Sequence, residues 1–157
     1  MPTGTITVRD ARAGDAAIVA DFNVKLALET EDHPLDPSVV EQGVRAILSD
    51  PAKGNYFVAE SGGEVVGCLL ITHEWSDWRN GDLWWIQSVY VRPDARGQGV
   101  FRKLYQHVEA AAKAADARGI RLYVERDNVD AQATYHKMGM TETPYRVMEV
   151  MFAAEHP

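Results

Sequence analysis

The segment that most constrains this chain runs from Val89 to Leu104, with the sequence V-Y-V-R-P-D-A-R-G-Q-G-V-F-R-K-L. An apolar run typical of a β-strand leads into a short loop with two glycines, and a helical pattern follows. A strand–loop–helix junction of this kind directs free backbone N–H groups and the positive end of a helix dipole at one point. We therefore expect this junction to bind an anionic group such as a phosphate.

The composition fits one globular domain over residues 1–157, because 46% of the 157 residues are hydrophobic and 25% are charged. The single cysteine, Cys68, has no partner for an internal disulfide. It lies in the apolar run V-V-G-C-L-L-I, which favours a core residue over a nucleophile. Apolar runs are too short to cross a membrane, and the first residues do not resemble a signal peptide, so we expect a cytoplasmic protein.

The net charge of −7 argues against general nucleic-acid binding, which normally needs a basic surface. An acidic protein favours cationic small molecules, although the same charge also serves solubility alone.

Hydrophobic periodicity predicts alternating strands and helices. Asp15 and Asp36–Pro37 are expected to begin two helices, and Asn80–Gly81 to form a turn in a polar loop that starts at His73. Gly139 is expected to end the last helix. The expected strands are 5–9, 55–60, 64–72, 83–91, 121–124 and 145–152, and the later helices are 99–115 and 128–138. The order is that of an α/β chain with a central hairpin meander.

The spacing of the glycines excludes two familiar phosphate-binding loops. The chain has no G-x-x-x-x-G-K-[ST] string. Gly97 and Gly99 are followed by Arg102 where a dinucleotide-binding fingerprint requires its third glycine.

The loop R-G-Q-G-V-F at residues 96–101 instead resembles the R/Q-x-x-G-x-G/A loop of the GNAT acetyltransferase superfamily. The preceding V-x-V-x-P, the distal N-V-D-A-Q-A-T-Y-H-K-M-G-M (128–140) and the opening V-R-D-A resemble that family as well. The resemblance covers essentially the whole chain. It implies an α/β fold with a mixed, mostly antiparallel sheet of six to seven strands flanked by about four helices. That sheet would splay between the strands Leu83–Val91 and Arg121–Val124.

The resemblance also implies acetyl-CoA as co-substrate, with no metal. The residues it assigns to acetyl-CoA binding are Val89, Tyr90, Val91, Arg96, Gly97, Gln98, Gly99, Val100, Phe101, Arg102, Asn128 and Tyr135. Phe101 departs from the family's glycine or alanine, and we expect its side chain to turn into the core so that only backbone amides face the phosphates. Asn128 has a second interpretation as an ordinary helix N-cap.

Acyl transfer to an amine needs a proton acceptor, an oxyanion donor and an acid for the departing thiolate. The resemblance makes Tyr135 the acid, and a backbone N–H near Val89 is expected to be the oxyanion donor. Gln87 cannot act as a base. Glu29 and Glu74 are the candidate carboxylates, either as the base or as the group that binds the cationic amine. The alternative for each is a solvated surface residue with no part in the site. His33 and His73 are weaker candidates, and Trp75 is the expected aromatic contact of a cationic substrate.

These residues predict an acetyl-CoA-dependent N-acetyltransferase in which a small primary amine, such as a polyamine-like molecule, attacks acetyl-CoA directly. A protein lysine or N-terminal acetyltransferase is one alternative, and a catalytically silent acyl-CoA-binding module is another. We expect a small-molecule amine as partner, a homodimer as an open possibility, and no nucleic acid or membrane.

Overall fold

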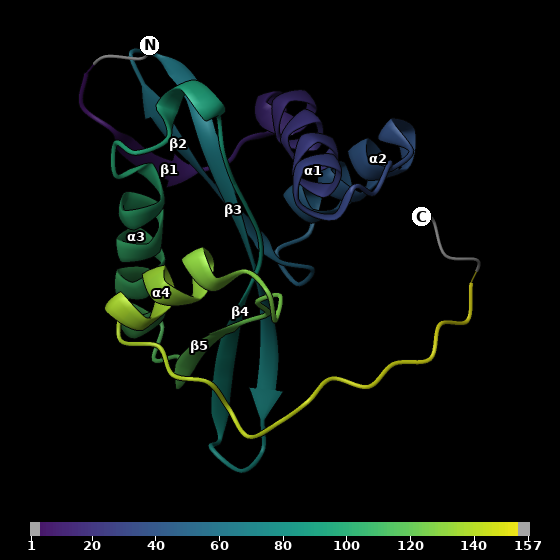
Figure 1. Cartoon of the computed structure of the whole chain (residues 1–157), viewed down its shortest axis with the longest axis vertical. Coiled ribbons are helices and arrows are strands. Elements are labelled where there is room, and N and C mark those ends of the chain that lie inside the picture. The colour runs from purple at the N-terminus through teal and green to yellow at the C-terminus, as the bar shows by residue number, and fades with distance from the viewer. Residues whose placement is uncertain (1–3, 154–157) are drawn as a thin grey trace.

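The computed structural model describes residues 4–153 of the chain (Figure 1). Its strands are β1 (Thr7–Asp10), β2 (Asn55–Ser61), β3 (Glu64–Ser76), β4 (Gly81–Val91) and β5 (Gly119–Leu122). Its helices are α1 (Ala16–Glu31), α2 (Pro37–Ser49), α3 (Val100–Ala114) and α4 (Val129–Lys137). Two short 3-10 turns, Ala13–Asp15 and Pro93–Ala95, precede α1 and α3.

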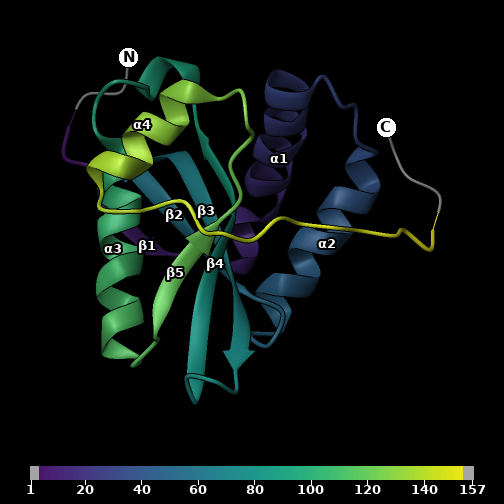
Figure 2. The ribbon, with the colours of Figure 1, turned by 60° about the horizontal axis from the view of Figure 1, so that its bottom comes forward.

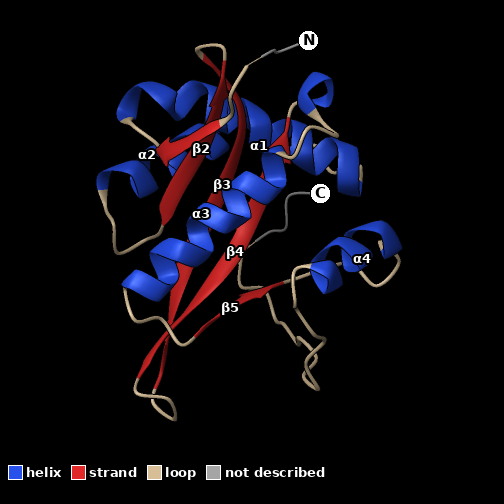
Figure 3. Ribbon diagram, turned by 90° about the vertical axis from the view of Figure 1, so that its left-hand side faces the viewer, coloured by secondary structure: helices blue, strands red, loops and turns tan. Residues whose placement is uncertain are grey.

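The five strands form one sheet in the order β1-β2-β3-β4-β5. All neighbours are antiparallel except β4 and β5, which are parallel. Helix α3 lies across one face of the sheet, and α1 and α2 lie across the other (Figures 2 and 3). The mixed, mostly antiparallel sheet with about four helices is confirmed.

Two hydrophobic clusters hold these layers together, one on each face of the sheet. Strand residues alternate between them: Leu69 and Ile71 pack toward α3, whereas Cys68 and Leu70 pack toward α1 and α2. Because both faces of the central strands are covered, their sequence is a continuous apolar run.

The sheet opens in the second half of β4, because β4 contains one extra residue there. Leu70 pairs with Ser88 and Ile71 pairs with Ile86, which leaves Gln87 as a bulge. Pairing between β4 and β5 ends at the same point, at Ile86 with Leu122. A bulge bends its strand and increases the local twist. The predicted splay between these two strands is therefore present, and it begins at Gln87.

The two aspartates expected to begin helices behave differently. Asp36 caps α2 as predicted, because its Oδ1 accepts a hydrogen bond from the Ser38 backbone N–H at 2.9 Å. Asp15 stands at the N-cap position of α1 but makes no cap bond there. Its carboxylate accepts from the Arg12 N–H at 2.7 Å and pairs with Arg9 at 2.8 Å.

Two sequence predictions about strands were wrong. The polar loop predicted from His73 to Asp82 is largely strand, because β3 continues to Ser76 and β4 starts at Gly81. This ribbon extends beyond the helices, so it lacks the buried apolar face that marks a strand in sequence. The expected strand 145–152 pairs with nothing in the described residues, so the sheet has five strands instead of six or seven.

None of the helices in residues 4–153 is long and apolar enough to cross a membrane.

Candidate functional site

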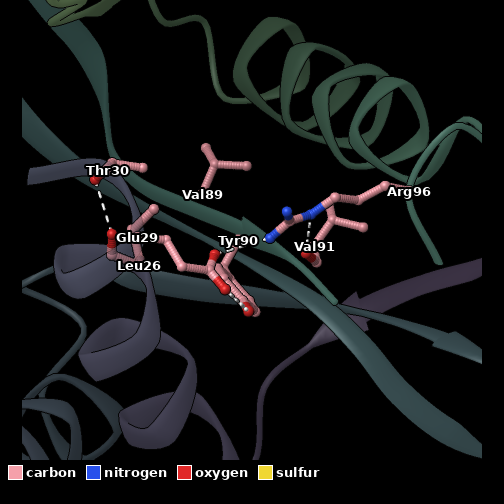
Figure 4. A pocket seen from close by; sticks show the side chains of 7 residues that line it. All are labelled: Leu26, Glu29, Thr30, Val89, Tyr90, Val91 and Arg96. Carbon is pink, nitrogen blue, oxygen red and sulfur yellow. Dashed lines mark hydrogen bonds and ion pairs between the residues drawn. The ribbon is translucent and has the colours of Figure 1, made fainter. Parts of the chain in front are cut away.

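A pocket of about 410 Å³ lies between the C-terminal end of α1, the end of β4 and the loop before α3 (Figure 4). It is lined by Leu26, Glu29, Thr30, Val89, Tyr90, Val91 and Arg96. Five of the residues proposed from the sequence therefore meet in one place, although Glu29 is 60 positions or more from the others in the chain.

An ion pair spans this pocket. Arg96 Nη2 lies 2.9 Å from Glu29 Oε2, and Arg96 Nε donates to the Val91 carbonyl at 2.9 Å. Both charged side chains are partly exposed to solvent. The guanidinium also lies over the Tyr90 ring, 5.4 Å from its centroid. Arg96 is thus oriented by three neighbours at the mouth of the glycine loop.

Tyr90 adds a contact that the sequence analysis missed. Its hydroxyl donates to Glu29 Oε1 at 3.1 Å, and its ring packs against Phe22. Burial, followed by the hydrogen bond to Glu29, raises the pKa of Tyr90. The strand period of two was the available signal, since it turns Tyr90 toward α1 while Val89 and Val91 turn toward α3.

The loop before α3 exposes its backbone. Gly97 and Gly99 adopt left-handed φ angles of 77° and 82°, which side chains other than glycine rarely tolerate. Among the described residues, no non-neighbouring atom lies within 4 Å of where a Cβ would stand on either glycine. Gly99 is also the N-cap of α3 and offers no capping side chain. The open backbone and helix N-terminus fit an anionic phosphate.

The second half of β4 presents a further run of backbone groups. From Gln87 onward this strand has β3 on one side and no β5 pairing on the other within the described residues. Apart from the Val91 carbonyl, which accepts from Arg96, the N–H and C=O groups on that open side can pair with an extended ligand, as in strand addition. The predicted oxyanion donor near Val89 lies in this stretch.

Helix α4 brings Tyr135 to the start of α3. The Tyr135 ring meets the Phe101 ring edge-on, with centroids 5.9 Å apart, and burial raises the pKa of Tyr135. Phe101 packs against the core cluster beside α3, as expected for a side chain that turns away from the glycine loop. Asn128 caps α4 by accepting from the Ala131 N–H at 3.1 Å, which is the alternative role recognised in the sequence.

Glu74 and Trp75 lie elsewhere, on the β3–β4 ribbon. Glu74 Oε1 accepts from the Trp85 indole N–H at 2.6 Å and lies 3.8 Å from Arg121. Trp75 is exposed. Neither residue lines the pocket that holds Glu29. His73 is likewise on this ribbon, 3.7 Å from Asp82.

A second pocket of about 400 Å³ adjoins the first, and the two share Leu26. It lies between α1, α2 and β4, and its polar lining includes Asn23, Tyr56, Gln87 and Ser88. Asn23 donates to the Tyr56 hydroxyl at 3.0 Å, and burial raises the pKa of Tyr56 to about 12. Scattered polar residues of this kind carry no sequence motif, so only the fold could reveal them.

Cys68 is fully buried, and burial raises the pKa of its thiol to about 12. A thiol in this environment does not supply a thiolate near neutral pH. The expected core role is confirmed.

Comparison with known proteins decides the family. The model of the Acetyltransferase (GNAT) family matches residues 21–140, which include the part of α1 that lines the pocket and the glycine loop. The chain belongs to the GNAT acetyltransferase family. The sequence resemblance is thereby confirmed.

Individual GNAT relatives differ in substrate and size. A mycothiol acetyltransferase of Streptomyces bingchenggensis is 33% identical over 90% of this chain, which spans only 44% of that protein. Aminoglycoside N(6')-acetyltransferase type 1 of Stenotrophomonas maltophilia is 26% identical, with 87% of each protein covered. The crystal structure of a possible acetyltransferase from Clostridium difficile 630 is 41% identical, with a TM-score of 0.89 over 95% of this chain and 99% of that one.

Within residues 4–153, the acidic, histidine and cysteine side chains form no group of three that could hold a metal ion.

Proposed function

We propose that this GNAT protein transfers the acetyl group of acetyl-CoA to a primary amine of a small molecule. The observation that carries the proposal is the pocket in which Glu29 faces the open backbone of β4 and the glycine loop. An anion-binding loop, a free strand edge and a carboxylate are the three elements that a phosphorylated thioester and a cationic amine would need.

Acetyl-CoA would bind along the open side of β4. Backbone groups from Gln87 to Val91 would pair with the amide-containing arm, and an N–H near Val89 would stabilise the developing oxyanion. The pyrophosphate would lie on the N–H groups of residues 97–102 at the start of α3. Arg96, at the edge of this loop, would contribute a charged donor.

Binding of the phosphates would also free Glu29. A partly exposed ion pair such as Glu29–Arg96 contributes only about 0–1 kcal/mol, so it exchanges partners at little cost. If Arg96 turns to the phosphates, the carboxylate of Glu29 becomes available to hold the ammonium group of the acceptor and to accept its proton, directly or through water. Tyr90 would keep that carboxylate in place through its hydrogen bond.

Tyr135 would supply the proton that the departing CoA thiolate needs. Its raised pKa keeps the phenol protonated, so it can donate to the departing thiolate of CoA. Direct attack by the amine needs no covalent intermediate, in agreement with the buried, protonated state of Cys68.

The nature of the acceptor is inferred from charge and from relatives. The net charge of −7 favours a cationic molecule. The relative from Stenotrophomonas maltophilia is named for acetylation of an aminoglycoside nitrogen, which supports a small amine over a peptide. Asn23 and Gln87 in the adjoining pocket would contact the rest of the acceptor.

The test uses the purified full chain, acetyl-CoA and a panel of aminoglycosides, polyamines and lysine peptides, with release of free CoA as the readout. We expect release above the no-acceptor rate with at least one small amine. Release with peptides alone would replace the proposal by a protein acetyltransferase. Binding of acetyl-CoA in calorimetry without release for any acceptor would replace it by a silent acyl-CoA-binding module.

A further inference from the structure

A row of polar and aromatic side chains continues one face of the sheet beyond α1 and α2. Leu70 packs toward these two helices, and the strand period of two places Thr72 and Glu74 of β3 on the same face. Across the sheet, Trp85 of β4 stands opposite Thr72, and Arg121 of β5 stands opposite Trp85. In Figure 1 the lower part of β3 and β4 extends past α1 and α2, so neither helix covers this row.

Four side chains at this end of the sheet combine an aromatic pair with a carboxylate and a guanidinium. The rings of Trp85 and Tyr123 lie with their centroids 4.7 Å apart, and Tyr123 is 58% exposed. Glu74 Oε1 accepts from the Trp85 indole N–H at 2.6 Å and lies 3.8 Å from Arg121 Nη1. Both contacts of Glu74 use Oε1, so within the described part of the chain Oε2 is available to a ligand. We call Glu74, Trp85, Arg121 and Tyr123 the distal surface.

The chemistry of the distal surface fits a polyhydroxylated ring better than a second ammonium group. Arg121 offsets the charge of Glu74, so these four side chains have no net charge to attract a cation. The carboxylate accepts hydrogen bonds and the guanidinium donates them, and a hydroxyl group can do both. The faces of Trp85 and Tyr123 provide an apolar platform for the carbon-bound hydrogens of such a ring.

The distal surface is continuous with the pocket between α1, α2 and β4 through Gln87. Gln87 lines that pocket and donates through Nε2 to Thr72 Oγ1 at 3.0 Å. Since Thr72 stands opposite Trp85, the pocket and the distal surface share one face of the sheet. At the other end of this face, Glu29 accepts from Tyr90, which lies five positions from Trp85 on β4. At about 3.3 Å per residue, and with the bulge between them, the two ends are roughly 15 Å apart along the strand.

We propose that the acceptor is an elongated amine built of linked polyhydroxylated rings, with its reacting amine at Glu29 and its far ring on the distal surface. This inference rests on the proposed function, because acetyl transfer itself takes place at Glu29. A single ring does not span roughly 15 Å, so the acceptor needs at least two linked rings. The far ring stacks on Trp85 and Tyr123, and its hydroxyl groups form hydrogen bonds with Glu74 and Arg121.

The experiment measures the binding of two probes to the full chain by calorimetry, with CoA in excess. Kanamycin has linked polyhydroxylated rings that carry amines, whereas spermine is a linear polyamine without a ring. Trp85→Leu removes the aromatic platform, so it is expected to weaken kanamycin binding about 10-fold and to change spermine binding by less than about twofold. The matched control Trp78→Leu removes a tryptophan that is exposed in the turn between β3 and β4, and it should change neither affinity.

A second variant, Tyr123→Ala, changes an exposed side chain and guards against misfolding of Trp85→Leu. It is expected to weaken kanamycin binding in the same direction, and a thermal melt checks that both variants stay folded. The proposal is overturned if the original chain does not bind kanamycin, or if both folded variants bind it as tightly as the original chain does. Equal losses for kanamycin and spermine would show a general cation site and would overturn the assignment of a ring.

Failure of this inference is distinguishable from failure of the proposed function. Release of CoA with spermine, or with the single-ring amine glucosamine, in a chain that does not bind kanamycin overturns the distal surface alone. Kanamycin binding that is weakened by Trp85→Leu, without release of CoA for any amine, overturns the proposed acetyl transfer and supports the distal surface as a ring-binding site.

Discussion

At the scale of single residues, the proton donor is the sharpest assignment to test. Tyr135 lies edge-on against Phe101, and the ring of phenylalanine would keep that contact. Tyr135→Phe is therefore expected to lower kcat about 10-fold or more, as typical for loss of a general acid, with acetyl-CoA affinity unchanged. Steady-state kinetics and calorimetry measure the two effects separately. Tyr105→Phe, a second buried tyrosine beside Phe101, is the control and should retain full kcat.

The ion pair in the pocket gives a second prediction at this scale, because its two members are assigned to different substrates. Arg96→Ala is expected to weaken acetyl-CoA binding about 10-fold or more, since a hydrogen bond to a charged group contributes about 1.5–3 kcal/mol. Glu29→Gln is expected to raise KM for the cationic amine instead and to leave acetyl-CoA affinity intact. Calorimetry with acetyl-CoA and KM values for the amine separate the two. Equal effects of both variants on both substrates would refute the division of roles.

At the scale of elements, our proposal places acetyl-CoA binding at the junction of the glycine loop with α3. Gly99→Glu would place a carboxylate beside the proposed position of the phosphates and is expected to abolish acetyl-CoA binding. Gly99→Lys imposes the same strain at φ 82° with the opposite charge, so it is the matched control. We expect Gly99→Lys to retain measurable binding in calorimetry. Equal losses in the two variants would mean that backbone strain, and not charge, explains the effect.

The elements also differ in how well the sequence alone predicts them. The glycine loop, α3 and the Asp36 cap were predictable because each depends on local chemistry within a few residues. The contact of Glu29 with Arg96 joins residues 67 positions apart, and only the fold brings α1 to the end of β4. The segment 145–152 has the pattern of a strand but lacks a partner in the described part of one chain, and pairing is not a local property.

At the scale of the whole molecule, stability should depend on pH through Asp15. Its hydrogen bond to Arg9 comes first among the contacts that lower the Asp15 pKa, and Arg9 also binds Glu60 on β2. Because the pKa of Asp15 is lower in the folded chain, its ionised carboxylate stabilises the fold at pH values above the unfolded pKa of about 3.9. This stabilisation is lost as the pH falls through the native pKa.

The variant Asp15→Asn should therefore be less stable than the original chain near neutral pH, by about 1–3 kcal/mol. The difference should shrink toward zero as the solution is acidified below the unfolded pKa of aspartate. Urea unfolding at neutral and acidic pH measures it. A destabilisation that is constant with pH would show that packing, and not the charge of Asp15, is responsible.

The bulge at Gln87 has a consequence for how this sheet tolerates changes in chain length. Leu70 and Ile71 are consecutive in β3, whereas their partners in β4, Ser88 and Ile86, are separated by Gln87. Strand β4 therefore has one residue more than β3 at this point. Deleting Gln87 would make the two counts equal and remove the bulge, while Tyr90 keeps its place opposite Cys68 and its orientation toward Glu29. The open side of β4, where we propose that acetyl-CoA binds, thus depends on β4 having one residue more than β3. Substitution at Gln87 preserves this difference, and only insertion or deletion removes it.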